Sequence, residues 1–207
     1  THTDSSAASD VYKRQAMLTH HLLASAGKSV AMAGNIGESF AKAITIYSPD
    51  YWVLELSSFQ LEDIISFHPR YAVVTSLTPD HLDRYNNSFD RYVDAKFCML
   101  KNQKEEDYFI YDDTDYEIKL ALERHKPKSQ RIPYTDKKIK DKRFNSIDMI
   151  RIDNPSLEGI HNSKNAMAAA TIAQLVNIRK QTIRDSLQTF KGAPHRLEKV
   201  LLSLIHI

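Results

Sequence analysis

Glu55 lies where a predicted strand turns into a predicted helix. Residues 51–54 form an apolar run typical of a strand buried on both faces of a parallel sheet. Ser57 then offers a helix N-cap, and Gln60 completes a capping box. Ligands bind along the carboxyl edge of such sheets, where an acid typically holds Mg²⁺ in phosphate-transferring folds. We therefore predict that Glu55 is a functional carboxylate. The alternative is that Glu55 is a partly exposed acid with no role beyond ending the strand.

Asn35 and His81 follow two other predicted strands in the same way. The segment Gly34-Asn35-Ile36-Gly37 fits a tight turn whose backbone can approach a ligand closely. The segment Thr78-Pro79-Asp80-His81 is typical of an N-cap, a first-turn proline and a first-turn acid. Because the carboxyl ends of parallel strands meet at one edge, we expect both segments to converge on Glu55. The alternatives are that residues 34–37 form a purely structural loop and that His81 has only a structural role.

Lys96 lies on the apolar side of a helix predicted from Ser88 to about Asn102. The apolar positions of that helix repeat at helical spacing and share a face with Lys96: Phe89, Val93, Phe97 and Leu100. A lysine that points inward must find a partner or lose its charge. The alternative is an amine that extends along the apolar surface to reach water at the rim.

A third set of polar side chains begins the long helix predicted from Gly159 to about Val176. Asn162 and Asn165 share a face near its N-terminus, where amide groups and free N–H groups can meet a phosphate or nucleotide. Four alanines on the following turns predict close helix packing. A hinge at residues 191–194 then leads to His195-Arg196-Leu197-Glu198.

Composition restricts the classes of function. The 207 residues carry a formal charge of only +2, which does not predict attachment to nucleic acid or membranes. No apolar run approaches the length of a membrane span. The single cysteine, Cys98, indicates a reducing compartment such as the cytoplasm. Gly27-Lys28-Ser29 is not a phosphate loop, because the pattern requires glycine where Leu22 stands and the strand–helix order is reversed.

The two ends of the chain are expected to be foreign to the protein. One choice of codons for residues 10–15 has a reverse complement that encodes residues 202–207, so the ends resemble translated sequencing adapter. We predict four parts: adapter-like tails at 1–15 and 202–207, a central domain at 16–191 that is truncated at its N-terminus, and the start of a C-terminal domain at 192–201.

Strands alternating with helices predict an α/β fold with a mostly parallel sheet flanked by helices. Three of residues 112–115 are aspartates, but they fit the cap and first turn of a helix better than a metal loop. Between residues 126 and 154 the pattern becomes short and polar. We therefore expect a small antiparallel patch there, formed by residues 131–134 and 147–152.

Together these segments resemble the motifs of the Mur ligase family, in the same order and at the same spacing, over essentially all of residues 16–201. The motifs that carry the resemblance are Gly34-Asn35-Ile36-Gly37, Glu55-Leu56-Ser57-Ser58-Phe59-Gln60-Leu61-Glu62, Thr78-Pro79-Asp80-His81-Leu82-Asp83-Arg84-Tyr85, Lys96, His161-Asn162-Ser163-Lys164-Asn165 and His195-Arg196-Leu197-Glu198. The motif from Glu55 to Glu62 is the most specific. It separates the D-glutamate-adding branch from other amino-acid ligases and from folylpolyglutamate synthases.

The resemblance implies a P-loop-type central domain without its phosphate loop, which in the family lies just before the helix that ends near Ala26. It also implies ATP and two Mg²⁺ ions as cofactors, and UDP-N-acetylmuramoyl-L-alanine and D-glutamate as substrates. A carboxylate is phosphorylated to an acyl phosphate, which the amine attacks. A cytoplasmic monomer acting in peptidoglycan synthesis, without nucleic-acid or membrane partners, is expected.

The resemblance also implies the role of each residue. Glu55 would hold Mg²⁺, and His81 with a carbamylated Lys96 would hold a second Mg²⁺ and the acyl phosphate. Substrate binding is assigned to four residues: Asn35, Ser57, Ser58 and Asp80. Nucleotide binding is assigned to Asn162, Asn165 and Arg196. The fragment alone is expected to be inactive; a different Mur-type or folylpolyglutamate-type ligase, or a noncatalytic nucleotide-binding domain, is the alternative.

Overall fold

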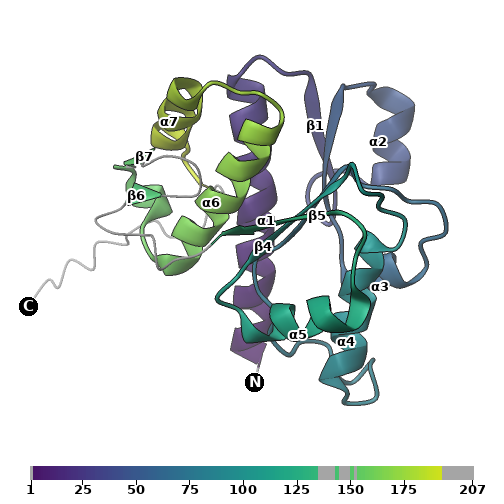
Figure 1. Ribbon diagram of the computed structural model, residues 1–207. Helices are drawn as coiled ribbons and strands as arrows, with labels where there is room; N and C mark the ends of the chain where they lie inside the picture. Colours follow the sequence, from purple (N-terminus) through teal and green to yellow (C-terminus); the bar gives the residue numbers. More distant parts are fainter. Residues whose placement is uncertain (1, 135–142, 145–149, 152, 193–207) are drawn as a thin grey trace, which may run out of the picture.

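The computed structural model describes residues 2–134, 143–144, 150–151 and 153–192 (Figure 1). Its main strands form two parallel sheets. In the first, β1 (Val30–Gly34) pairs with β2 (Tyr51–Glu55). In the second, β4 (Tyr108–Asp112) lies between β3 (Tyr71–Val74) and β5 (Gln130–Tyr134). The predicted fold class, parallel strands flanked by helices, is confirmed.

Seven α-helices in the described residues connect and cover these strands. Their bounds are α1 (His2–Ser25), α2 (Phe40–Ile46), α3 (Ser58–Glu62), α4 (Phe89–Phe97), α5 (Tyr116–His125), α6 (Ile160–Leu175) and α7 (Lys180–Thr189). Two 3₁₀ helices, Cys98–Leu100 and Pro155–Leu157, follow α4 and precede α6. Helix α6 lies beside α1, and α7 packs on both (Figure 1).

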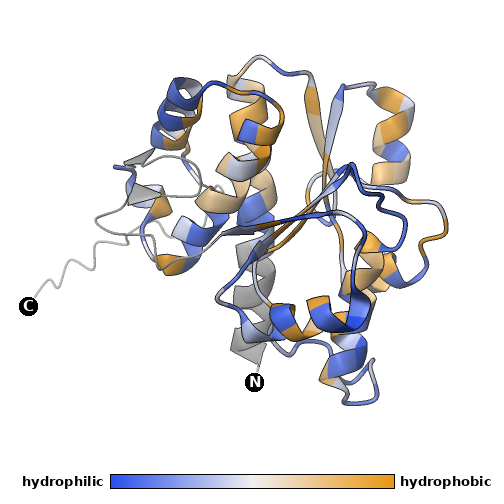
Figure 2. Ribbon diagram, in the orientation of Figure 1, coloured by the Kyte–Doolittle hydropathy of each residue, from blue (hydrophilic) through white to orange (hydrophobic). Residues whose placement is uncertain are grey.

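The strands alternate their side chains between two apolar layers. Tyr71 and Val73 pack against the core formed by α1, α6 and α7, whereas Ala72 and Val74 belong to the core under α4 and α5. Figure 2 shows hydrophobic residues on β1, α2 and α6, and mainly hydrophilic residues on α7. Helices therefore cover both faces of β3, which explains why this strand is apolar throughout.

The predicted antiparallel patch is smaller than expected. Residues 131–134 belong to β5 and pair parallel with β4, so their assignment to the patch was wrong. The patch consists of β6 (Arg143–Phe144) and β7 (Ile150–Arg151). β5 is an outer strand of its sheet, which explains both its exposed residues and its tolerance of Pro133.

The predicted helix start at residues 78–81 is absent, and turns occupy residues 81–87. The Asp80 side chain accepts a hydrogen bond from the His81 N–H at 2.9 Å, a local bond that competes with helix formation. His81, Asn86 and Asn87 all have positive φ values, which a right-handed helix cannot accommodate. The sequence Thr-Pro-Asp therefore begins a series of turns.

Candidate active site

The turn after β1 is held directly against Glu55. The Asn35 N–H donates to the Glu55 carbonyl at 2.9 Å, and the Asn35 side chain hydrogen-bonds the Glu55 side chain. Gly34 has φ +109°, and a Cβ at this position would lie 2.2 Å from the Glu55 carbonyl oxygen. Only glycine permits this approach. The predicted meeting of these two strand ends is therefore confirmed.

The Glu55 carboxylate is incompletely satisfied. Burial raises its pKa, while the nearby charges of Lys13 and Lys96 and the bond from Asn35 oppose that rise. Its Oε2 atom is buried and has no hydrogen-bond partner among the described residues. Leaving such an acceptor unpaired costs about 1–3 kcal/mol, and a bound cation would remove that cost.

The two serines after Glu55 are held by helix α3. Ser57 forms the predicted capping box: its hydroxyl accepts from the Gln60 N–H at 3.3 Å, and its own N–H donates to Gln60 Oε1 at 2.9 Å. Ser58 is buried and hydrogen-bonds Tyr85. The capping box thus fixes the turn from β2 into α3 that positions Glu55.

Lys96 points inward from α4, as one of the two sequence interpretations expected. Its Nζ lies 4.0 Å from the centre of the Tyr12 ring and 5.2 Å from that of Tyr92. The Tyr12 hydroxyl donates to the Ser76 carbonyl at 2.5 Å, which places this α1 residue over the carboxyl end of β3. Lys96 is also close enough to Glu55 to act on its pKa. An amine and a carboxylate therefore share this edge.

Asp80 and His81 lie in the turn that follows β3. His81 Nε2 is 3.5 Å from Asp80 Oδ2, and the His81 ring lies 5.0 Å from that of Phe59 on α3. Asp80 also helps to raise the pKa of Tyr92, after burial and Tyr12. These contacts place the turn beside α3 and α4. Within the described part of the chain, no three His, Cys, Asp or Glu side chains are grouped to hold a metal.

Two of the three residues expected to bind nucleotide, Asn162 and Asn165, lie in the described part of the chain, both on α6. Asn162 donates to the Glu158 carbonyl at 2.7 Å, within the start of α6. Asn165 is fully buried, and Arg196 lies outside the described residues. The expectation that both asparagines present their amides to a ligand is therefore unsupported for Asn165, because helix packing covers its side chain.

Sequence reasoning missed an ion pair at the end of β4. Lys164 Nζ lies 2.6 Å from Asp112 Oδ2 and donates to Thr114 Oγ1 at 3.2 Å. Asp112 is the last residue of β4, as Glu55 is of β2, so the same strand-end rule could have identified it. The predicted helix cap in this segment is confirmed: Asp115 Oδ1 accepts from the N–H groups of Glu117 and Ile118.

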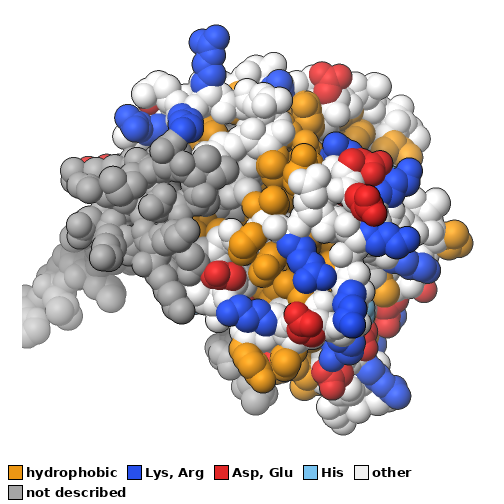
Figure 3. Space-filling view, viewed as in Figure 1, with side chains coloured by type: hydrophobic (Ala, Val, Ile, Leu, Met, Phe, Trp, Pro, Cys, Tyr) orange, Lys and Arg blue, Asp and Glu red, His pale blue; other side chains and the backbone are white. Residues whose placement is uncertain are grey.

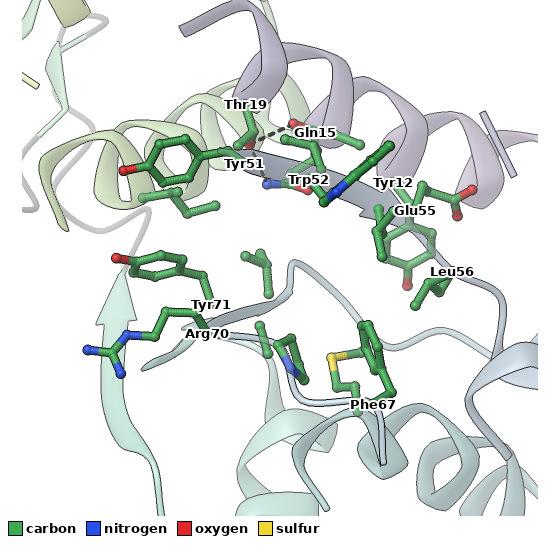
Figure 4. A pocket seen from close by; sticks show the side chains of 18 of the residues that line it. Tyr12, Gln15, Thr19, Tyr51, Trp52, Glu55, Leu56, Phe67, Arg70 and Tyr71 are labelled. Atoms are coloured by element: carbon green, nitrogen blue, oxygen red, sulfur yellow. Dashed lines mark hydrogen bonds between the residues drawn. The ribbon is translucent and has the colours of Figure 1, made fainter. Parts of the chain in front are cut away.

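A cavity of about 640 Å³ extends from this edge between β2 and β3. Figure 4 shows Tyr12, Gln15 and Thr19 of α1 along one side, and Glu55 at the end where the strands finish. Lys96 lines the same cavity. Elsewhere the surface carries intermixed charges, as on the face shown in Figure 3. Among the described residues no helix is both long and apolar enough to cross a membrane.

Polar side chains at the carboxyl edge of a parallel, helix-covered sheet define an α/β ligand-binding domain. Residues 15–173 match the family model of the Mur ligase middle domain. The chain therefore belongs to the Mur ligase family. Solved structures agree in fold: a MurF ligase from Thermotoga maritima in complex with ADP has a TM-score of 0.68 at 15% identity, with 88% of this chain and 47% of that one covered. For an FPGS–AMPPCP complex the TM-score is 0.64 at 14% identity, with 91% and 63% covered.

Curated relatives share one printed name, UDP-N-acetylmuramoylalanine--D-glutamate ligase. The relative from Christiangramia forsetii is 46% identical over 196 residues, and that from Porphyromonas gingivalis strain W83 is 38% identical over 200 residues. Each alignment covers 89% of this chain but only 44% of the relative. The chain thus spans less than half the length of the curated relatives it matches.

Proposed function

We propose that this chain is the central part of an ATP-dependent ligase that joins D-glutamate to UDP-N-acetylmuramoyl-L-alanine. The observation that carries the proposal is the buried, unpaired Glu55 oxygen beside Asn35 and Lys96 at the carboxyl edge of β2. The names of the curated relatives supply the substrates. Cytoplasmic, monomeric action in peptidoglycan synthesis, and hence in cell shape and division, belongs to the same proposal.

The donor set at Glu55 fits Mg²⁺. This ion prefers oxygen ligands, and it is usually bound by one or two carboxylates together with substrate phosphates. A single buried carboxylate oxygen without a partner is therefore adequate, although no preformed cluster of three acidic or histidine ligands is described. When bound, ATP and Mg²⁺ supply the phosphoryl group and the positive charge that offsets its oxygens.

Lys96 and the turn at Asp80 and His81 would act on the substrate carboxylate. Lys96 reaches the site between two aromatic rings, which favours a fixed position for its amine. Addition of CO₂ to the neutral amine would form a carbamate and release a proton, changing a cation into an anionic oxygen ligand for a second ion. His81, about half exposed, would donate to oxygens that gain negative charge. Asn35, Ser57 and Ser58 would position the muramoyl substrate, and Asn162 and Arg196 the nucleotide.

The deciding experiment uses the full-length parent, with the flanking coding sequence recovered. We expect amide formation from ATP, UDP-N-acetylmuramoyl-L-alanine and D-glutamate. Lys96→Ala should lower turnover by about 10²- to 10³-fold, as when a charge-stabilising group is removed. Lys101→Ala is the matched control, because this lysine is exposed just beyond α4. Unchanged turnover in Lys96→Ala would leave a noncatalytic nucleotide-binding domain as the better interpretation.

Two further measurements sharpen the proposal. A panel of amino acids tests D-glutamate against the substrates of other Mur-type and folylpolyglutamate-type ligases. Labelling with ¹³C-bicarbonate tests carbamylation, and the label should disappear in Lys96→Ala. The 207-residue chain alone is expected to show no ligation, because it spans less than half of the curated ligases it matches.

A further inference from the structure

The chain between β3 and His81 has no regular secondary structure. Residues 75–80 form neither helix nor strand. In the described part of the chain, two side chains hydrogen-bond the backbone of this segment: that of Tyr12 at the Ser76 carbonyl, and that of Asp115 at the Leu77 N–H. The place of His81 at the candidate site therefore depends on few fixed points.

Asp115 uses its two carboxylate oxygens for two different parts of the molecule. Its Oδ1 atom caps α5, because it accepts from the Glu117 N–H at 3.0 Å and from the Ile118 N–H at 3.1 Å. Its Oδ2 atom accepts from the Leu77 N–H at 2.9 Å. A helix cap needs only one side-chain oxygen. The second oxygen therefore makes an additional contact, which joins the start of α5 to the segment after β3.

The residues just before Asp115 fix its position at the end of β4. Asp112 Oδ1 accepts from the Thr114 N–H at 2.9 Å and from the Thr114 hydroxyl at 2.7 Å. The Asp113 N–H donates to the Tyr134 carbonyl on β5 at 2.8 Å. Asp112 also forms the ion pair with α6 described above. Residues 112–115 are thus joined to two neighbouring elements, so Asp115 is held in a defined place.

Asp115 is the anchor that lies outside the predicted adapter-like tail, which includes Tyr12. Leu77 is buried, with only 4% of its surface exposed. A buried N–H without a partner is costly, and a carboxylate is a strong acceptor for it. Packing of the Leu77 side chain in the core under α4 and α5 does not meet that requirement. The bond from Leu77 to Asp115 is therefore expected wherever this segment is folded.

Leu77 and Asp80 together fix the start of the turn that carries His81. Leu77 lies four residues before His81 in the sequence. Asp80 then orients His81, because its side chain accepts from the His81 N–H at 2.9 Å. A misplacement of about 1 Å at a reacting group can cost about 10²-fold in rate. Loss of the anchor at Leu77 should therefore be visible in turnover.

We propose that Asp115 is a positioning residue: its Oδ2 atom holds the segment after β3 at Leu77 and thereby places His81. The inference rests on the proposed function, in which His81 donates to oxygens that gain negative charge. That charge develops during the reaction, so loss of the anchor should lower kcat and leave the KM values nearly unchanged. A residue that only caps α5 would not produce this difference.

Asp115→Asn separates the two contacts of this carboxylate. Asparagine caps helices as well as aspartate does, but the amide nitrogen that replaces Oδ2 cannot accept from the Leu77 N–H. In the full-length parent we expect kcat to fall by about 10- to 100-fold, with KM values changed by less than about twofold. Asp113→Asn is the matched control, because it removes the neighbouring charge and its Oδ1 atom has no partner among the described residues.

Amide hydrogen exchange of the 207-residue chain tests the anchor without reference to catalysis. In Asp115→Asn the Leu77 amide should exchange faster by about tenfold or more, whereas the capped Ile118 amide should keep its rate. Asp115→Ser is the second variant, because serine also caps helices but has no second oxygen. It should give the same two results if Asp115→Asn fails to fold. An unchanged Leu77 amide in the folded variant overturns the proposal.

A double-mutant cycle in the full-length parent tests whether Asp115 acts through His81. Added to His81→Ala, Asp115→Asn should lower kcat by less than about twofold. A further fall as large as that in the unmodified parent overturns the proposal. Equal turnover of Asp115→Asn and Asp113→Asn in an active parent overturns this inference alone. A parent that forms no amide overturns the proposed function, and this inference with it.

Discussion

Two carboxylates at opposite ends of the strands, one fully and one partly buried, have opposite environments. Asp107, immediately before β4, accepts hydrogen bonds from the Lys104 N–H at 2.7 Å, from His68, and from Arg70 at 3.3 Å. Burial acts to raise the Asp107 pKa, but these bonds outweigh it, and the pKa is lowered. Glu55, at the end of β2, keeps an unpaired buried oxygen, and burial raises its pKa.

Asp107 is therefore a structural carboxylate, whereas Glu55 has an oxygen available to a ligand. The loops around Asp107 are further fixed by Gln103, whose amide donates to the Pro69 and Tyr108 carbonyls at 2.9 and 3.1 Å. At Glu55 the protein supplies fewer hydrogen-bond donors than the carboxylate could accept. This is the arrangement expected where a ligand completes the coordination.

The largest expected effect is on stability at Asp107. We expect Asp107→Asn to lower the free energy of unfolding by about 3 kcal/mol, because charge-assisted bonds to a fully buried carboxylate are lost. Urea unfolding measures it. Glu106→Gln is the matched control: this neighbour is exposed and should change stability by about 0.5 kcal/mol or less. Equal effects at both positions would contradict the structural role of Asp107.

The structural role of Asp107 should also appear in the pH dependence of stability. A carboxyl whose pKa is lowered on folding stabilises the protein above its ordinary pKa of about 4, and that contribution is lost as the pH falls through the lowered value. The stability difference between the unmodified chain and Asp107→Asn should therefore shrink on acidification below about pH 4. Urea unfolding at a series of pH values measures this. A difference that grows in acid would refute the assignment.

Glu55→Gln should act in the opposite direction on the isolated chain. We expect the free energy of unfolding to stay unchanged or to rise by up to about 1 kcal/mol, because a partly buried charge with an unpaired oxygen is replaced by a neutral amide of similar size. Activity of the full-length parent should be lost in the same variant. A stability loss comparable to that of Asp107→Asn would show that Glu55 is a structural residue.

The sequence predicted those features of the site that depend on residue spacing within one or two neighbouring elements. The capping box at Ser57 and Gln60, the junction of Asn35 with Glu55 and the inward side of Lys96 all follow from spacing along one or two elements. Each depends on periodicity or on the meeting of parallel strand ends.

The errors arose where tertiary contacts or competing local bonds decide. The turns from His81 to Asn87 depend on three residues with positive φ, which a Thr-Pro-Asp start does not reveal. The parallel arrangement of β5 depends on its pairing with β4, and the burial of Asn165 depends on the elements packed around α6. The cavity between β2 and β3 depends on strand order, which the sequence of these residues does not specify.

The smallest expected effect concerns Tyr12, which lies in the predicted adapter-like tail yet covers Lys96. Tyr12→Phe should cost about 1 kcal/mol, because the hydrogen bond to the Ser76 carbonyl is lost while the ring stays over the amine. Tyr12→Ala should also remove the ring and increase acetylation of Lys96 by a small water-soluble reagent. Labelling of the exposed Lys101 serves as the internal control. Equal Lys96 labelling in Tyr12→Ala and Tyr12→Phe would show that the aromatic ring does not shield the amine, so that access to this edge of the sheet is governed by α4 alone.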